Sequence, residues 1–187
     1  MSQPDPFTSA RTLVRDTLLR ERFLRLWRRC FPASTPVDAD VAWSKVERHY
    51  SEPHRVYHDP QHLAHCLEQL DLSNGLIVHP DQVEMAIWFH DIINEPESPD
   101  NEQRSADYFR TLTRGVADEQ FVDAVVDLIL VTTHEVAPND PDQQFITLYS
   151  GHQPIRHDNK NLHIIFFVQL FNHFPGFIGT FGKLVPI

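Results

Sequence analysis

A histidine and an aspartate stand side by side inside the largely apolar stretch AIWFHDIINEP, residues 86–96. Burying either side chain without a partner is costly, so His90 and Asp91 must either be satisfied by hydrogen bonds or hold something charged. A neutral imidazole and a carboxylate are good ligands for Zn, Mn or Fe, and a mixed nitrogen and oxygen site with an open position suits hydrolysis. The pair is therefore a candidate metal site.

Three further groups of polar residues have similar potential: HRVYHDPQH at 54–62, DNEQRSA at 100–106 and TTHE at 132–135. Histidine is the commonest metal ligand among the side chains, and the chain contains twelve of them. Each group lies at or beside the end of an expected helix. Side chains at the helix ends of a bundle can converge on one pocket, so these groups are candidates for a single site.

Apolar residues that recur three and four positions apart predict helices along most of the chain. The sequence FPASTP at 31–36 separates the first two helices, and Asp38 or Asp40 is suited to cap the second. No alternating strand pattern of any length appears, so we expect an all-α fold. The expected helices span residues 8–31, about 38–50, 60–70, 80–92, 100–112 and 118–134.

Length, charge and cysteine content narrow the class of protein. A chain of 187 residues suits one domain with a sizeable core. The net charge of −10 argues against a nucleic-acid polymer or an anionic membrane as the main partner. The two cysteines, Cys30 and Cys66, form neither a zinc-type pair nor a disulfide framework. With no apolar signal segment and no run of the roughly 18 apolar residues that span a membrane, we expect a cytoplasmic protein.

The four blocks HRVYHDPQH, AIWFHDII, DNEQRSA and LILVTTHE follow one another in this order. Over about residues 10–142, the sequence thereby resembles the predicted metal-dependent phosphohydrolases of the HD superfamily, in its small bacterial branch. Four blocks in order are far more specific than one His-Asp pair. The resemblance implies a single all-α domain over residues 1–187, an HD-domain-like helical bundle in which residues 143–187 are an atypical C-terminal segment.

The resemblance also implies a metal site and a reaction. His62 matches the family's first ligand, and His90 with Asp91 matches its His-Asp pair. These residues would bind a divalent ion, with Mn, Zn, Fe, Co, Ni and Mg as candidates. The implied enzyme is a phosphoric ester hydrolase that acts on a small phosphorylated molecule, for example a nucleotide, through metal-activated water.

Four further polar residues are catalytic candidates through the same resemblance. His134 matches a histidine that in related enzymes contacts a second metal or the phosphate. Arg55, His58 and Glu102 match recurrent polar positions whose roles in this branch are open. Arg55 or a histidine could balance the charge of a phosphate group.

The sequence departs from the family at one ligand. The family has a last aspartate shortly after the TTHE block, but here the corresponding residues 147–149 read TLY. Asp140 and Asp142 lie slightly too early to replace it, and Asp158 lies in a segment that does not align. We therefore expect weaker metal affinity and weaker activity than an intact site would have.

The missing aspartate coincides with a change in composition. Residues 161–187 contain one charged residue, Lys183, and six of the thirteen phenylalanines. A change of reading frame in the gene and drastic divergence of the tail would each explain this. Besides the hydrolase, two functions remain open: a catalytically impaired relative that binds metal or nucleotide without turnover, and a di-iron oxygenase on the same fold.

Overall fold

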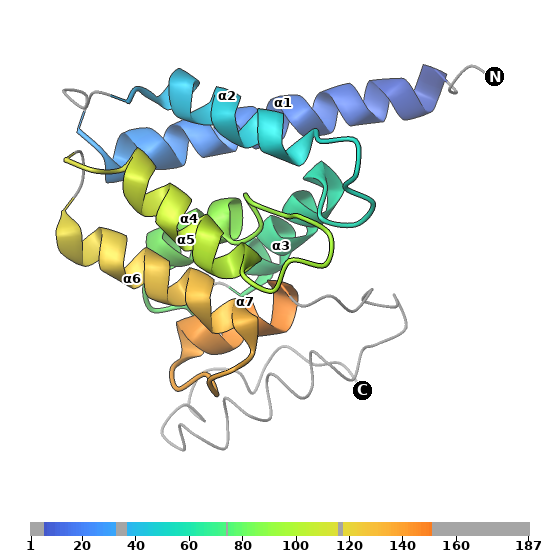
Figure 1. Cartoon of the computed structure of the whole chain (residues 1–187). Coiled ribbons are helices and arrows are strands. Elements are labelled where there is room, and N and C mark those ends of the chain that lie inside the picture. The colour runs from blue at the N-terminus through green and yellow to red at the C-terminus, as the bar shows by residue number, and fades with distance from the viewer. Residues whose placement is uncertain (1–5, 33–36, 74, 116–117, 151–187) are drawn as a thin grey trace, which may run out of the picture.

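A computed structural model describes residues 6–32, 37–73, 75–115 and 118–150 of the chain (Figure 1). Within these residues every regular element is helical, so the all-α prediction is confirmed. Asp158, considered above as a ligand, lies outside the described residues. The elements are α1 (Pro6–Cys30), α2 (Ala39–Tyr50), α3 (Pro60–Leu72), α4 (Pro80–Phe89), α5 (Asn101–Leu112), α6 (Glu119–Leu130), the 3₁₀ turn η1 (Val131–Thr133) and α7 (Pro141–Ser150).

Aspartates begin several of these helices. The Asp38 side chain accepts hydrogen bonds from the first backbone N–H groups of α2, as the sequence predicts, and Asp59 and Asp118 do the same for α3 and α6. Such caps satisfy N–H groups that have no partner within the helix. Asp100 precedes α5, but its carboxylate accepts a hydrogen bond from Ser98 Oγ at 2.5 Å instead of capping the helix.

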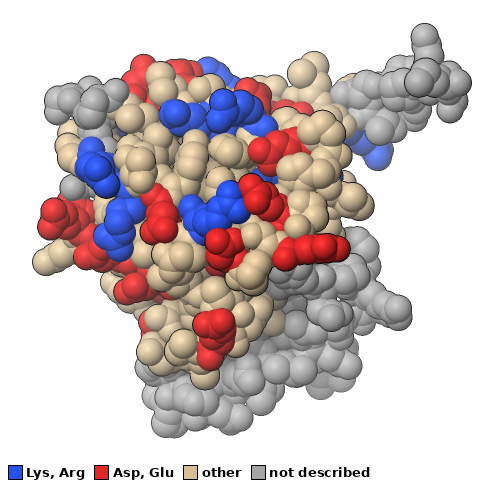
Figure 2. Space-filling model, in the orientation of Figure 1, with Lys and Arg blue, Asp and Glu red and all other residues tan. Residues whose placement is uncertain are grey.

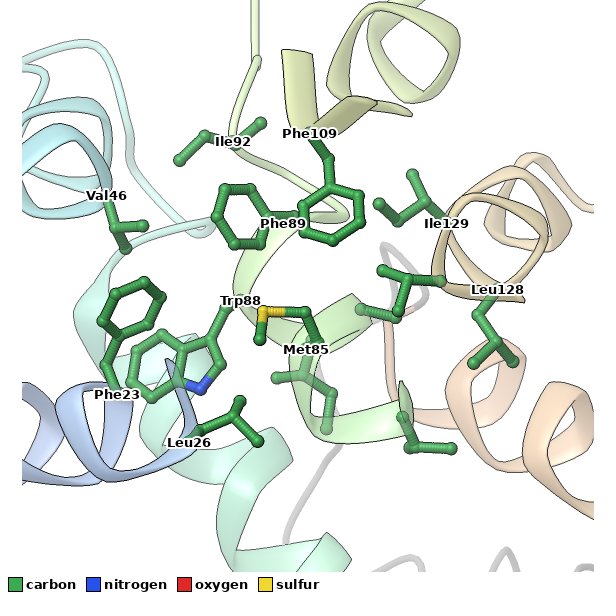
Figure 3. Close-up of a cluster of buried hydrophobic side chains, with 14 of the residues drawn as sticks. Phe23, Leu26, Val46, Met85, Trp88, Phe89, Ile92, Phe109, Leu128 and Ile129 are labelled. Carbon is green, nitrogen blue, oxygen red and sulfur yellow. The ribbon is translucent and has the colours of Figure 1, made fainter. Parts of the chain in front are cut away.

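Helix α4 lies at the centre of the core and contacts α1, α3, α5, α6 and α7. All residues from Val83 to Phe89 are buried, as expected for a helix that is covered on all sides. Figure 3 shows Trp88 beside Phe23 of α1 and Phe89 beside Phe109 of α5, with ring centroids 5.4 and 4.9 Å apart. Packing on every side fixes the position of α4, and with it the position of the residues that follow its last turn.

One buried charge in this core is satisfied by an arginine. Glu84 of α4 accepts a hydrogen bond from Arg22 of α1 at 2.9 Å, and the same guanidinium donates to Asp71 of α3 at 2.7 Å. A buried carboxylate without a partner would be destabilising, so Arg22 both neutralises Glu84 and joins three helices.

On the face shown in Figure 2, acidic and basic side chains are interspersed. Exposed ion pairs also join neighbouring helices, for example Arg110 of α5 with Asp123 of α6 at 2.6 Å. Water screens such pairs, so they contribute little to stability compared with the core. Among the described helices, none combines the length and apolar character that crossing a bilayer requires.

Two helices end earlier than the sequence pattern predicts, and one is not predicted. The helix expected to continue to residue 92 ends at Phe89, and the one expected to continue to residue 134 gives way to η1 after Leu130. Helix α7 lies in the region of the missing family aspartate and packs against α3, α4, α6 and η1 (Figure 1). Its contacts place it beside the residues discussed next.

Candidate metal centre

Two segments that are distant in sequence bring three histidines and an aspartate together. His58 lies in the loop before α3, and His62 lies in the first turn of α3, whose start is set by the Asp59 cap. His90 and Asp91 follow directly after α4, where the core helix ends. The cluster of His58, His62, His90 and Asp91 is buried and could hold a metal ion.

Three potential metal-ligand atoms at the centre of this cluster form a triangle. The Nε2 atoms of His62 and His90 are 3.4 Å apart, and Asp91 Oδ2 lies 3.7 Å from the first and 2.8 Å from the second. Nitrogen and oxygen ligands at about 2.0–2.2 Å from a zinc-type ion are about 3.3–3.6 Å from one another in a tetrahedral arrangement. Two of the observed distances, 3.4 and 3.7 Å, are close to this range, and the 2.8 Å contact would have to lengthen for the three atoms to bind one ion.

The two ring nitrogens of His90 show why a cation suits this place. Nδ1 lies 2.9 Å from the backbone oxygen of Ile87, which can only accept, so Nδ1 carries a hydrogen. In the neutral ring Nε2 then has a lone pair, which faces the Asp91 carboxylate oxygen at 2.8 Å. Two acceptors this close repel each other unless a proton or a metal ion lies between them. Metal-binding histidines commonly donate their other N–H to a backbone carbonyl, as His90 does.

Burial and Asp91 determine the charges in the cluster. Burial disfavours charged His90, but the Asp91 carboxylate outweighs this effect and raises the pKa of His90. Burial alone would also raise the pKa of Asp91, but His90 and the hydrogen bond from His58 hold it well below its ordinary value. Burial, followed by the neighbouring His90, lowers the pKa of His62 to about 3. Asp91 is thus ionised and His62 neutral, the protonation states that metal ligands require.

His58 binds the same carboxylate oxygen. Its Nδ1 lies 2.5 Å from Asp91 Oδ2, and because an ionised carboxylate can only accept, the Nδ1–H group of His58 is the donor. The Tyr57 ring packs beside both neighbouring imidazoles, with its centroid 5.1 Å from the ring centroids of His58 and His62. His58 therefore orients Asp91, and direct coordination through Nδ1 would break this hydrogen bond.

Arg55 joins the two segments that form the cluster. Its guanidinium donates to the backbone oxygens of His58 at 3.2 Å, Asp91 at 2.7 Å and Ile92 at 2.9 Å. Its Nε also donates to the Glu52 carboxylate at 3.1 Å. The side chain is 1% exposed. These contacts tie the loop before α3 to the end of α4, so in this structure Arg55 holds the backbone of the site.

Glu102 lies near the cluster, whereas His134 is exposed. Glu102 is half-buried in the first turn of α5. Burial and Asp91 have the larger effects on the pKa of His90, and the charge of Glu102 helps to raise it. His134 follows η1 with a left-handed φ of 60°. None of the cluster contacts described above involves His134.

The two aspartates of the α7 region have other roles. Asp142 is buried and accepts hydrogen bonds from the backbone N–H groups of Val78 at 2.7 Å and His79 at 3.0 Å, just before α4. Asp140 accepts from the backbone N–H of Gln143 in the first turn of α7. Within the described part of the chain, α7 therefore supplies no carboxylate to the cluster.

Cys66 also lies in this region, although its place in the sequence does not mark it as a site residue. It lies one turn after His62 on α3, and its Sγ is 3.6 Å from His62 Nε2. Its thiol also donates to the backbone oxygen of Tyr149 in α7 at 3.3 Å. The i, i+4 spacing of His62 and Cys66 was an available signal, because such residues share one face of a helix. It is easily overlooked because Cys66 also fits the apolar stripe of α3.

No protein-family model matches the sequence, and comparisons with curated proteins and with solved structures give no match either. The helical fold and the buried cluster are compatible with an HD-type site. Arguments about function therefore depend on the geometry of the cluster and on the order of the sequence blocks.

Proposed function

We propose that the protein is a metal-dependent phosphohydrolase of the HD type that acts on a small phosphorylated molecule. The observation that carries this proposal is the buried contact between His90 Nε2 and Asp91 Oδ2, which lie 2.8 Å apart and need a shared proton or metal ion between them. His62 presents a third donor atom to the same place. The ordered sequence blocks support the HD assignment. A divalent ion bound there would act as a Lewis acid on a phosphoryl oxygen and would lower the pKa of water.

In this proposal the surrounding residues hold and orient the ligands. His58 fixes the Asp91 carboxylate through its Nδ1–H donor. The Ile87 carbonyl fixes the His90 tautomer, so that Nε2 points toward the ion site. Arg55 is a positioning residue, because its hydrogen bonds hold the backbone at both His58 and Asp91. A rigid set of ligands of this kind needs little reorganisation during the reaction.

Metal-dependent turnover tests the proposal. Protein freed of metal by a chelator is mixed with a chromogenic phosphomonoester and with Mn, Co, Ni, Zn or Mg in turn. We expect hydrolysis with at least one metal and its loss in His90→Gln. His79→Gln is the matched control, because His79 lies at the opposite end of the same helix and its side chain contacts Asp142 at 2.9 Å rather than the cluster. Folded, metal-loaded wild type that hydrolyses no phosphoester would contradict the proposed hydrolase activity.

A second function, binding without turnover, is supported by one observation: the carboxylates of Asp140 and Asp142 accept backbone hydrogen bonds away from the cluster. Without a further carboxylate, the chain could bind a metal or nucleotide and lack turnover. Metal that stays with the protein through gel filtration, combined with no hydrolysis of phosphomonoesters or nucleotides, would favour this non-catalytic relative. Wild type that binds none of the metals would contradict both functions.

A further inference from the structure

Cys66 lies next to the proposed metal ligands and is 1% exposed. Its Sγ is 3.6 Å from Nε2 of His62. The same nitrogen lies 3.4 Å from His90 Nε2 and 3.7 Å from Asp91 Oδ2. His62 Nε2 is therefore surrounded by three potential ligand atoms, from three other residues, at nearly equal distances.

The distance from the sulfur to His62 Nε2 matches the distance between two ligands of one ion. With Zn–S at about 2.3 Å and Zn–N at about 2.0–2.1 Å, tetrahedral angles place sulfur and nitrogen about 3.5 Å apart. Cys66 and His62 already have this separation. Their i, i+4 spacing is also the one at which two side chains of one helix bind a single zinc ion.

The charge of the site favours a second anionic ligand. A divalent ion bound by neutral His62, neutral His90 and ionised Asp91 would leave one net positive charge in a buried place, which is unfavourable. The family resemblance places a second carboxylate nearby, but residues 147–149 read TLY. A thiolate at Cys66 would bring the net charge of ion and ligands to zero.

We infer that Cys66 is a fourth metal ligand, with water or phosphate entering as a fifth, and that its thiolate biases the site toward Zn²⁺ and Co²⁺ rather than Mg²⁺. Thiolates are soft ligands, whereas Mg²⁺ is bound by oxygen atoms. The inference rests on the metal site proposed above. On coordination the Sγ–H bond breaks, an Sγ–metal bond forms and the proton passes to solvent. Tyr149 then loses the hydrogen bond that its backbone oxygen accepts from the thiol.

Cobalt spectroscopy on the full chain tests this inference. Titration of metal-free wild type with Co²⁺ should produce near-ultraviolet sulfur-to-cobalt charge-transfer absorption, which nitrogen and oxygen ligands do not give. Cys66→Ser and Cys66→Ala should lose this absorption and bind Co²⁺ at least about 10-fold more weakly. Cys30→Ser is the matched control, because Cys30 is the other cysteine of the chain and lies at the end of α1. It should keep both the absorption and the affinity.

The outcomes separate this inference from the proposed function. Wild type that binds Co²⁺ without charge-transfer absorption would overturn the role of Cys66 and leave the metal site in place. Equal Co²⁺ affinities of wild type and folded Cys66→Ser would overturn it as well. Wild type that binds neither Co²⁺ nor Zn²⁺ would contradict the metal site itself. The wild-type spectrum decides the question even where a Cys66 variant fails to fold.

Discussion

Arg55→Ala would remove the guanidinium that joins the loop before α3 to the end of α4. That side chain is 1% exposed and donates four hydrogen bonds, three of them to backbone oxygens. A hydrogen bond with a charged partner contributes about 1.5–3 kcal/mol, and a buried acceptor left without a partner costs about 1–3 kcal/mol. Such losses are less than additive, so we expect the free energy of unfolding to fall by about 3–5 kcal/mol.

Urea unfolding followed by circular dichroism measures this loss. With a slope of about 2 kcal/mol per M, the urea midpoint of Arg55→Ala should fall by about 2 M. The urea midpoint of Arg55→Lys should fall by about half as much, because one ammonium group cannot replace the several N–H donors of the guanidinium. Arg110→Ala is the control. Arg110 and its partner Asp123 are 49% and 61% exposed, so its midpoint should shift by less than about 0.5 M.

A midpoint for Arg55→Ala within about 0.5 M of wild type would refute this reasoning. The other role that the family resemblance leaves open for Arg55 is direct contact with a phosphate group. In that case the variant would keep its stability and show a raised KM for a phosphorylated substrate. Stability and KM measured on the same variant therefore distinguish a positioning residue from a phosphate ligand.

Three further substitutions probe the fold. Asp142→Asn turns an amide group toward the N–H donors of Val78 and His79, and the free energy of unfolding should fall by about 1.5–3 kcal/mol; an unchanged urea midpoint would contradict this. Phe23→Ala leaves a cavity at a fully buried site, so we expect the free energy of unfolding to fall by about 3–5 kcal/mol in the same assay. A fall of less than about 1 kcal/mol would show that the core collapses to fill the cavity. Burial lowers the pKa of His49 below its ordinary 6.5, so the unfolded chain binds a proton there more readily than the folded chain does. Stability contributed by neutral His49 should therefore decrease as the pH falls through 6.5, and His49→Gln should show a smaller loss of stability between about pH 7 and about pH 5.

Helices whose signals are local are well predicted from the sequence. Apolar spacing and a capping residue such as Asp38 are sufficient to locate α1 to α6, with errors at their ends. Helix α7 is not predicted, although Phe145, Ile146 and Tyr149 on it are buried. Their burial depends on contacts with α3 and α4, which no local pattern encodes. A distant contact also lies at the end of α4, where Arg55 donates to the backbone oxygens of Asp91 and Ile92.

In the candidate site too, some features can be predicted from the local sequence and others depend on contacts between distant segments. The sequence blocks lead to His62, His90 and Asp91, and the structure brings these side chains together; that they bind a metal stays a prediction. Arg55 lies in a polar loop, where a side chain is expected to face water, yet it is directed inward to backbone oxygens. In the sequence Cys66 fits the apolar stripe of α3, whereas in the structure its thiol donates to a backbone oxygen of α7. Directions of side chains across segments are tertiary properties, so spacing along the chain cannot supply them.

His90 and Asp91 directly follow α4, which contacts five other helices, and the backbone N–H of His90 still donates to Ala86 in that helix at 2.8 Å. These two residues cannot swing aside without disturbing the core. We therefore expect the His90 amide to exchange with deuterium only through global unfolding, unlike amides in loops. A chelator can reach a bound ion from the side open to substrate, but the ligands that it must displace are held by the core, so we expect slow removal of the ion. Retention of the ion would then be a kinetic property of the whole core rather than of the ligands alone.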